Sequence, residues 1–177
     1  MDAKHIELIV KQCENQRVLD RPDAVARFAI AYDQARNMAR VGFSPTWDQM
    51  LEWAALVEPV NAKGFRRVPV RFGWTAQGLR PELIENAMRN WYGAYKNYLL
   101  TGDAAFGHVE SKFREDLFYP SGISIDQHLE FYRAFQEIHP WEDGNGRVGH
   151  LLWALSHAIR GNGWPLELPP DLWGTEG

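Results

Sequence analysis

The sequence predicts an all-α fold with one short β excursion. Most of the chain consists of stretches whose apolar residues recur three or four positions apart, which is typical of amphipathic helices. One short stretch alternates polar and apolar residues instead, as a β-strand does. The 177 residues contain no internal repeat, low-complexity segment or linker. We therefore expect a single domain over residues 1–177, large enough to bury a core without disulfides or metals.

Residues typical of helix ends flank several of the periodic stretches. We expect helices at residues 23–41, 45–56, 80–101, 124–138 and 145–160. Gly42, Gly102 and Gly161 each follow one of these patterns, where glycine commonly ends a helix. Ser44 and Pro45 fit the cap and first turn of the second helix. The last two helices are strongly amphipathic.

The β excursion lies in "GFRRVPVRFG", residues 64–73, which two glycines bracket. Val68, Val70 and Phe72 share one side of the expected strand, and Arg67, Pro69 and Arg71 share the other. Because Pro69 has no N–H to donate to a ladder, this should be an edge strand or a small hairpin. An exposed edge can serve as a docking rail for another chain's backbone.

Charge and cysteine content argue against a nucleic-acid-binding protein and against a disulfide-stabilised one. The chain has 19 Lys and Arg against 23 Asp and Glu, a net charge of −4, which argues against a direct nucleic-acid partner. Cys13 is the single cysteine, so no internal disulfide can form. The sequence contains neither a secretory signal of the usual form nor a membrane-spanning run. We expect a soluble cytoplasmic protein with no membrane partner, although delivery into another cell stays open.

The densest cluster of chemically able side chains is "HPWEDGNGR", residues 139–147, between the last two helices. His139 can be neutral near pH 7 and accept a proton. Asp143 could hold Mg²⁺, which commonly binds one or two carboxylates plus substrate phosphates. Gly144 and Gly146 let the backbone approach a bulky group, and the following helix begins with N–H groups that attract phosphate. Arg147 adds a forked donor to phosphate oxygens. Together these residues suit an attack on a phosphate.

Other interpretations of the same residues are weaker. A capped turn between helices explains each residue singly, but a turn needs no Asn-Gly-Arg after its cap. Zinc binding by His139, His150 and His157 lacks a His-Glu-x-x-His pattern or paired cysteines. A Ser–His–Asp hydrolase lacks the Gly-x-Ser-x-Gly elbow.

The nine residues closely resemble the motif of the Fic family, His-x-Phe-x-Asp/Glu-Gly-Asn-Gly-Arg-x-x-Arg. The resemblance covers about residues 45–168 and includes "GNGWP" at 161–165, which is similar to the segment that often closes the helix after the motif. It implies a Fic-like helical bundle in which residues 64–73 form a β-hairpin flap. Residues 1–44 would be a helical extension of this core.

The resemblance implies a nucleotidyltransferase, specifically a protein adenylyltransferase that moves AMP from ATP to a Ser, Thr or Tyr hydroxyl of a target protein. In such an enzyme His139 would be the general base and Asp143 would hold Mg²⁺. Nucleotide binding would fall to Gly144, Asn145, Gly146, Arg147 and His150. The target would lie on the flap residues Arg67, Val68, Val70 and Arg71.

Two positions depart from the family motif. Trp141 replaces the usual Phe, and another aromatic side chain is tolerable at a position that packs in the core. His150 replaces the final Arg, which in relatives grips the γ-phosphate side of the donor. His150 lies three residues after Arg147, so we expect both on one helix face. Because a histidine is shorter and only partly charged, the nucleotide donor and its affinity could differ from those of the family.

The sequence leaves alternatives open for how the protein is inhibited and for which reaction it performs. Many Fic proteins are restrained by a Ser/Thr-x-x-x-Glu-Gly/Asn segment, and the nearest matches, around Glu14 and Glu115, are each incomplete. Restraint by a separate antitoxin-like inhibitor protein is an equal alternative. A catalytically weak Fic-fold binding module, or transfer of another nucleotide or phosphoryl group, is the alternative to AMP transfer.

Overall fold

A computed structural model describes residues 1–72, 76–103 and 126–173 and confirms the all-α class. The α-helices are α1 (Ala3–Asn15), α2 (Pro22–Arg40), α3 (Trp47–Val57), α4 (Ile84–Thr101), α5 (Gln127–Ile138) and α6 (Asn145–Ile159). Two 3₁₀ turns, η1 (Pro59–Lys63) and η2 (Pro81–Leu83), flank the hairpin region. Among the described helices, none combines the length and the apolar content needed to cross a membrane.

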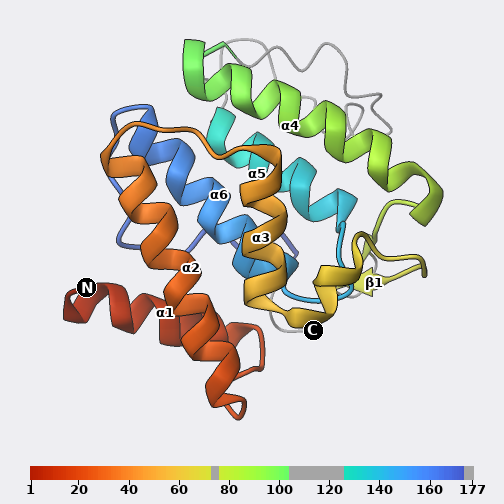
Figure 1. The fold of residues 1–177 in the computed structure, drawn as a ribbon, viewed down its shortest axis with the longest axis horizontal. Helices are drawn as coiled ribbons and strands as arrows, with labels where there is room; N and C mark the ends of the chain where they lie inside the picture. The colour runs from red at the N-terminus through yellow and green to blue at the C-terminus, as the bar shows by residue number, and fades with distance from the viewer. Residues whose placement is uncertain (73–75, 104–125, 174–177) are drawn as a thin grey trace.

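Helix α6 forms the centre of the molecule and packs against α2, α3 and α5 (Figure 1). The sequence predicts an amphipathic helix here, but the structure buries α6 on almost every side, because three helices surround it. Gly149 leaves room for two side chains of α5, since a Cβ there would clash with Gln136 and lie 3.1 Å from the Tyr132 ring. α4 covers the far side of α5, and α1 packs on α2 (Figure 1). The helix that follows the motif is therefore fixed rigidly in the core.

Two helix starts differ from the sequence-based expectation. α3 is capped by Thr46, whose Oγ1 accepts from the Gln49 N–H at 3.1 Å, so the helix begins after the expected Ser44 cap. α5 begins at Gln127, and Asp126 caps it by accepting from the Leu129 N–H at 3.0 Å. The first residues of the expected 124–138 helix lie outside the described part of the chain.

The β excursion is shorter than the alternating sequence suggests. β1 (Arg71–Phe72) pairs with β2 (Ala76–Gln77) in antiparallel register, with Arg71 opposite Gln77. The Gly78 N–H also donates to the Val70 carbonyl at 3.1 Å, which continues the pairing toward the body. Residues 64–70, where the expected strand begins, are not strand. The two strands lie at the end of the molecule where α5 connects to α6 (Figure 1).

Candidate functional site

The residues of the α5–α6 connection meet at one cavity. α5 ends at Ile138, its C-cap is His139, and α6 begins at Asn145. Beside this connection lies a cavity of about 260 Å³. The motif residues on its wall are His139, Glu142, Asp143, Gly144, Asn145 and Gly146. The structure thus brings together the expected base, the expected metal carboxylate and three of the expected nucleotide-binding residues. The end of α1 and residues 168–173 line the other sides.

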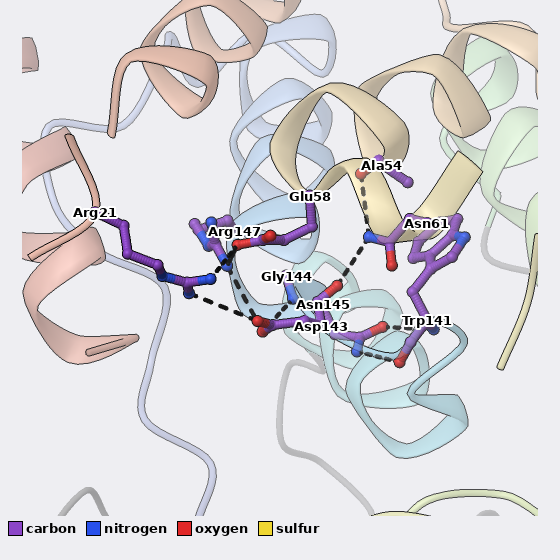
Figure 2. A network of polar contacts seen from close by, with 9 residues as sticks. All are labelled: Arg21, Ala54, Glu58, Asn61, Trp141, Asp143, Gly144, Asn145 and Arg147. Carbon is purple, nitrogen blue, oxygen red and sulfur yellow. Dashed lines mark hydrogen bonds and ion pairs between the residues drawn. The ribbon is translucent and has the colours of Figure 1, made fainter. Parts of the chain in front are cut away.

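Asn145 fixes the shape of the connection. Its Oδ1 accepts from the Trp141 N–H at 3.0 Å, and its Nδ2 donates to the Trp141 carbonyl at 2.9 Å (Figure 2). Its own carbonyl accepts from Nε2 of Gln136 on α5 at 3.1 Å. Because the side chain is used inside the loop, Asn145 can offer an anion only its backbone N–H.

Asn145→Ala is expected to lower the free energy of unfolding by about 2–4 kcal/mol. The substitution leaves both backbone groups of the fully buried Trp141 without their side-chain partner, at about 1–3 kcal/mol each. Urea denaturation measures the effect. Asn37→Ala, on the exposed face of α2, is the matched control and should change stability by less than about 0.5 kcal/mol. Equal stability of the two variants would contradict this account of the loop.

The N-terminus of α6 forms one wall of the cavity. Its first N–H groups have no partner within the helix, and such an end attracts phosphate. Gly144 is the N-cap of the helix, with a φ of +77°, and its N–H donates to Oδ1 of Asp143 at 2.7 Å. A Cβ at Gly146 would lie 2.5 Å from the side-chain amide of Gln16. Glycine at this position therefore lets the end of α1 lie against the first turn of α6.

His139 is held in an unusual backbone conformation. Its φ is 50° and its ψ is 62°, in the left-handed region that few residues other than glycine enter. Nδ1 lies 3.3 Å from the Gln136 carbonyl. A carbonyl can only accept, so this contact places the ring proton on Nδ1 and makes Nε2 the basic nitrogen. Burial, with a smaller contribution from Arg66, lowers the His139 pKa to about 4, so the ring is neutral at pH 7.

Asp143 is the carboxylate that fits a metal role. Its side chain is 50% exposed and lines the cavity. Oδ2 lies 3.6 Å from Nη2 of Arg21, and Oδ1 lies 3.6 Å from Nη2 of Arg147 (Figure 2). Within the described residues no group of three or more acidic, His or Cys side chains is gathered for a metal. Glu142 and Asp171 are further exposed carboxylates on the cavity wall, but the three are not gathered as one ligand set, which suits Mg²⁺ that arrives with phosphates better than a metal held by protein alone.

Arg147 is engaged by a partner that sequence reasoning missed. Its side chain is fully buried, and Nη2 lies 2.8 Å from Oε1 of Glu58, just after α3. Arg21 approaches the same Glu58 oxygen at 3.4 Å, which makes a network of two cations and two carboxylates with Asp143 (Figure 2). The sequence contains no local signal for this network, because Glu58 and Arg147 are 89 positions apart.

His150 does not lie at the cavity, which corrects the expected nucleotide-binding role. The ring is fully buried in the contact between α2 and α6. Its centroid lies 5.8–6.3 Å from those of Tyr32, Phe28 and Trp153. Burial lowers the His150 pKa to about 3, so the ring carries no charge near pH 7. Arg147 meets Glu58 just after α3, whereas His150 packs against α2, so the two side chains have different neighbours.

The expected flap residues lie at the surface, but the neighbouring Arg66 is buried. Arg67, Val68 and Arg71 are exposed, and Val70 is half-buried. Val68 is 55% exposed, so it does not anchor the segment on the body as the alternation suggests. Arg66 is 2% exposed, and its N–H donates to the Pro140 carbonyl in the motif at 2.9 Å. The alternation did place Arg66 on the apolar side with Val68 and Val70, and this was the signal that could have found it.

Of the two candidate inhibitory glutamates, Glu14 is described, and it does not line the cavity. Glu14 is exposed on α1, and Glu115 lies outside the described residues. The C-cap of α1, Gln16, lies against Gly146 of the motif. The segment around Glu14 reaches the cavity through Gln12 and Asn15, and the role of the segment around Glu115 stays a prediction.

Stability is expected to fall as the pH drops from about 6.5 toward about 4. Burial lowers the pKa of His128 and of His139 to about 4, and that of His150 to about 3. The unfolded chain, with ordinary histidines, binds more protons in this window, so acid favours unfolding, by up to about 1.4 kcal/mol per pH unit for each such ring. Urea denaturation between pH 7.5 and 5 measures the slope. A free energy of unfolding that stays constant or rises would contradict the burial of these rings.

Comparison of the chain with protein-family models and with curated proteins found no match. The functional interpretation therefore depends on the geometry of the residues themselves.

Proposed function

We propose that this chain is a Mg²⁺-dependent protein adenylyltransferase of the Fic type, which transfers AMP from ATP to a Ser, Thr or Tyr hydroxyl of a target protein. The observation that carries this proposal is the shared cavity. A neutral histidine, an exposed carboxylate and the N-terminus of a rigid helix line it together, at His139, Asp143 and Gly144–Gly146. These are a base, a metal ligand and an anion site.

The proposed reaction is a single displacement at phosphorus. Nε2 of His139 takes the proton of the target hydroxyl, whose oxygen forms a bond to the α-phosphorus of ATP. The bond from that phosphorus to the oxygen bridging the β-phosphate breaks, so AMP stays on the target and pyrophosphate leaves. His139 suits this step because Nδ1 faces the Gln136 carbonyl and burial keeps the ring neutral.

The phosphates would bind at the start of α6. The backbone N–H groups of Asn145 and Gly146 supply fixed donors there, and the glycines admit a close approach. Mg²⁺ bound with the nucleotide would neutralise phosphate charge, and Asp143 is the residue that would hold it. Arg147 is fully buried with Nη2 on Glu58 and does not line the cavity, so it could grip the β-phosphate only after a movement that exposes its side chain. His150 takes no part in this proposal, since it packs in the core.

The target would pair with the hairpin edge through main-chain hydrogen bonds. Val68→Asp is then expected to lower target modification about tenfold, with ATP affinity unchanged, because the exposed Val68 lies in the segment that would contact the target. Labelled transfer and calorimetric ATP binding measure the two quantities. Val41→Asp, on an equally exposed apolar residue at the end of α2, is the matched control. Equal loss of target modification and ATP affinity would show that the segment is only structural.

A catalytically weak binding module is the second candidate. Arg147 is paired with Glu58, and His150 is buried in the core. The cavity therefore has fewer cations than a triphosphate site usually offers, which favours this candidate. In this case the hairpin would hold a partner protein without modifying it.

Transfer assays separate the two candidates. The chain is incubated with Mg²⁺, a lysate and ATP labelled either on the α- or on the γ-phosphate. Adenylyl transfer labels protein from α-labelled ATP alone. Label from the γ-position would indicate phosphoryl transfer. Parallel reactions with GTP, CTP and UTP identify another donor, and the absence of label with all four nucleotides would support the binding module.

A further inference from the structure

Arg66 is a buried cation whose guanidinium binds only backbone oxygens among the described contacts. It is 2% exposed. Its acceptors are the carbonyls of Val68, Leu79, Ile138 and His139. No described carboxylate lies within ion-pair distance of it. A buried charge is usually paired, so an arginine that serves carbonyls alone needs an explanation.

The carbonyls that Arg66 binds belong to two separate parts of the fold. Val68 and Leu79 lie before β1 and after β2, so they form the two sides of the hairpin base. Ile138 and His139 lie at the C-terminus of α5, where unpaired carbonyls and the helix dipole favour a cation. Arg66 therefore ties the hairpin to the last turn of α5.

The same contact fixes the backbone of His139. The carbonyls of Ile138 and His139 come before and after the left-handed φ and ψ of His139, and the guanidinium binds both. A non-glycine residue in this conformation costs about 1–3 kcal/mol and persists where its surroundings enforce it. Gly78 adds to the enforcement, since a Cβ there would lie 2.6 Å from Nη2 of Arg66 and 3.2 Å from Cβ of His139. The space around the His139 backbone is thus filled by the hairpin base.

We infer that Arg66 is the positioning residue for His139. It holds the histidine backbone in the left-handed conformation that aims the imidazole into the cavity, and it couples that aim to the hairpin on which the target would dock. The inference rests on the proposed function for its catalytic meaning, whereas the positioning itself is a property of the fold. Arg66 touches neither nucleotide nor target in this account, so it acts through His139 alone.

The charge of Arg66 supports the same role. The His139 pKa is lowered chiefly by burial, and the nearby guanidinium lowers it further, whereas Asp143 raises it. Glu142 and Asp171 also line the cavity and are the same in every variant compared below. The arrangement keeps the ring neutral at pH 7.

Kinetics of the full chain with Arg66→Gln, Arg66→Lys and Gly78→Ala test the inference. Arg66→Gln should lower kcat for AMP transfer by about 10- to 100-fold, the effect of a small misplacement of a reacting group, and leave KM for ATP within about twofold. Arg66→Lys keeps the charge but loses the planar guanidinium that binds several carbonyls at once, so its kcat should lie between those of Arg66→Gln and the wild type. Gly78→Ala keeps Arg66 and displaces it, so it should also lower kcat. Arg80→Gln, at an exposed arginine beside the same hairpin, is the matched control.

A second readout is independent of activity. The ring resonances of His139, assigned by their loss in His139→Ala, are compared by NMR at one pH above 7. They should shift in Arg66→Gln and in Gly78→Ala, and stay in place in Arg80→Gln. Resonances unchanged in both variants, or equal losses of kcat and ATP affinity, would overturn the inference. If the wild type transfers nothing from any nucleotide, the proposed function fails, and the ring resonances still decide the positioning.

Discussion

His139→Ala is expected to lower the rate of AMP transfer by roughly 10²–10⁴-fold, with ATP affinity and melting temperature close to those of the wild type. A positioned general base contributes a factor of this size. The ring lies at the C-cap of α5 on the cavity wall, outside the buried hydrophobic core, so its removal leaves the core packing in place. Initial rates with α-labelled ATP measure the loss.

His139→Asn is the matched variant for this prediction. Asn enters the left-handed region more readily than most residues, so it preserves the backbone at φ 50°, but it has no basic nitrogen. Both variants should therefore lose transfer together. A wild-type rate in His139→Asn, with unchanged melting, would assign proton removal to another group and leave His139 a structural role.

His150→Arg is expected to lower the free energy of unfolding by about 3 kcal/mol or more. The substitution restores the final Arg of the Fic motif in sequence, but the structure places the side chain in the core among the rings of Phe28, Tyr32 and Trp153. An unpaired guanidinium there loses its hydration at a cost of several kcal/mol. Urea denaturation at pH 7.5 measures the loss.

His150→Phe separates the charge from the loss of the native ring. Phe has a similar shape, and neither nitrogen of His150 has a hydrogen-bond partner among the described residues. Removal of such buried polar atoms is nearly neutral or stabilising, so His150→Phe should stay within about 1 kcal/mol of the wild type. If His150→Arg were as stable as the wild type and bound ATP more tightly, the position would serve the phosphates, and the burial of His150 would be wrong.

Local sequence predicted the parts of this molecule that local forces decide. The helices follow from periodicity and end signals, and the candidate site can be found in the sequence because its residues are contiguous at the α5–α6 connection. The side chain of His150 was placed on a shared face with Arg147 because periodicity describes one exposed stripe. α6 has no such stripe, since three helices cover it, and each neighbour decides where one side chain goes.

The supporting residues could not be predicted, because they act across the chain. Glu58 meets Arg147 only after α3 packs near α6, and Asn61 donates to the Asp143 carbonyl across 82 positions. The alternation places Arg66 on the side of Val68 and Val70, but it carries no information about the partners of Arg66. Its four carbonyl partners come from both sides of the hairpin and from α5, and they become neighbours only in the folded chain.

Mass spectrometry of the modified protein tests the central claim most directly. The chain is incubated with ATP, Mg²⁺ and a lysate, beside a matched reaction with His139→Asn, and the modified peptides are sequenced by fragmentation. The account predicts an added mass equal to AMP on a Ser, Thr or Tyr hydroxyl, present with the wild type and absent with the variant. An added phosphate, or AMP that appears equally with His139→Asn, would contradict it.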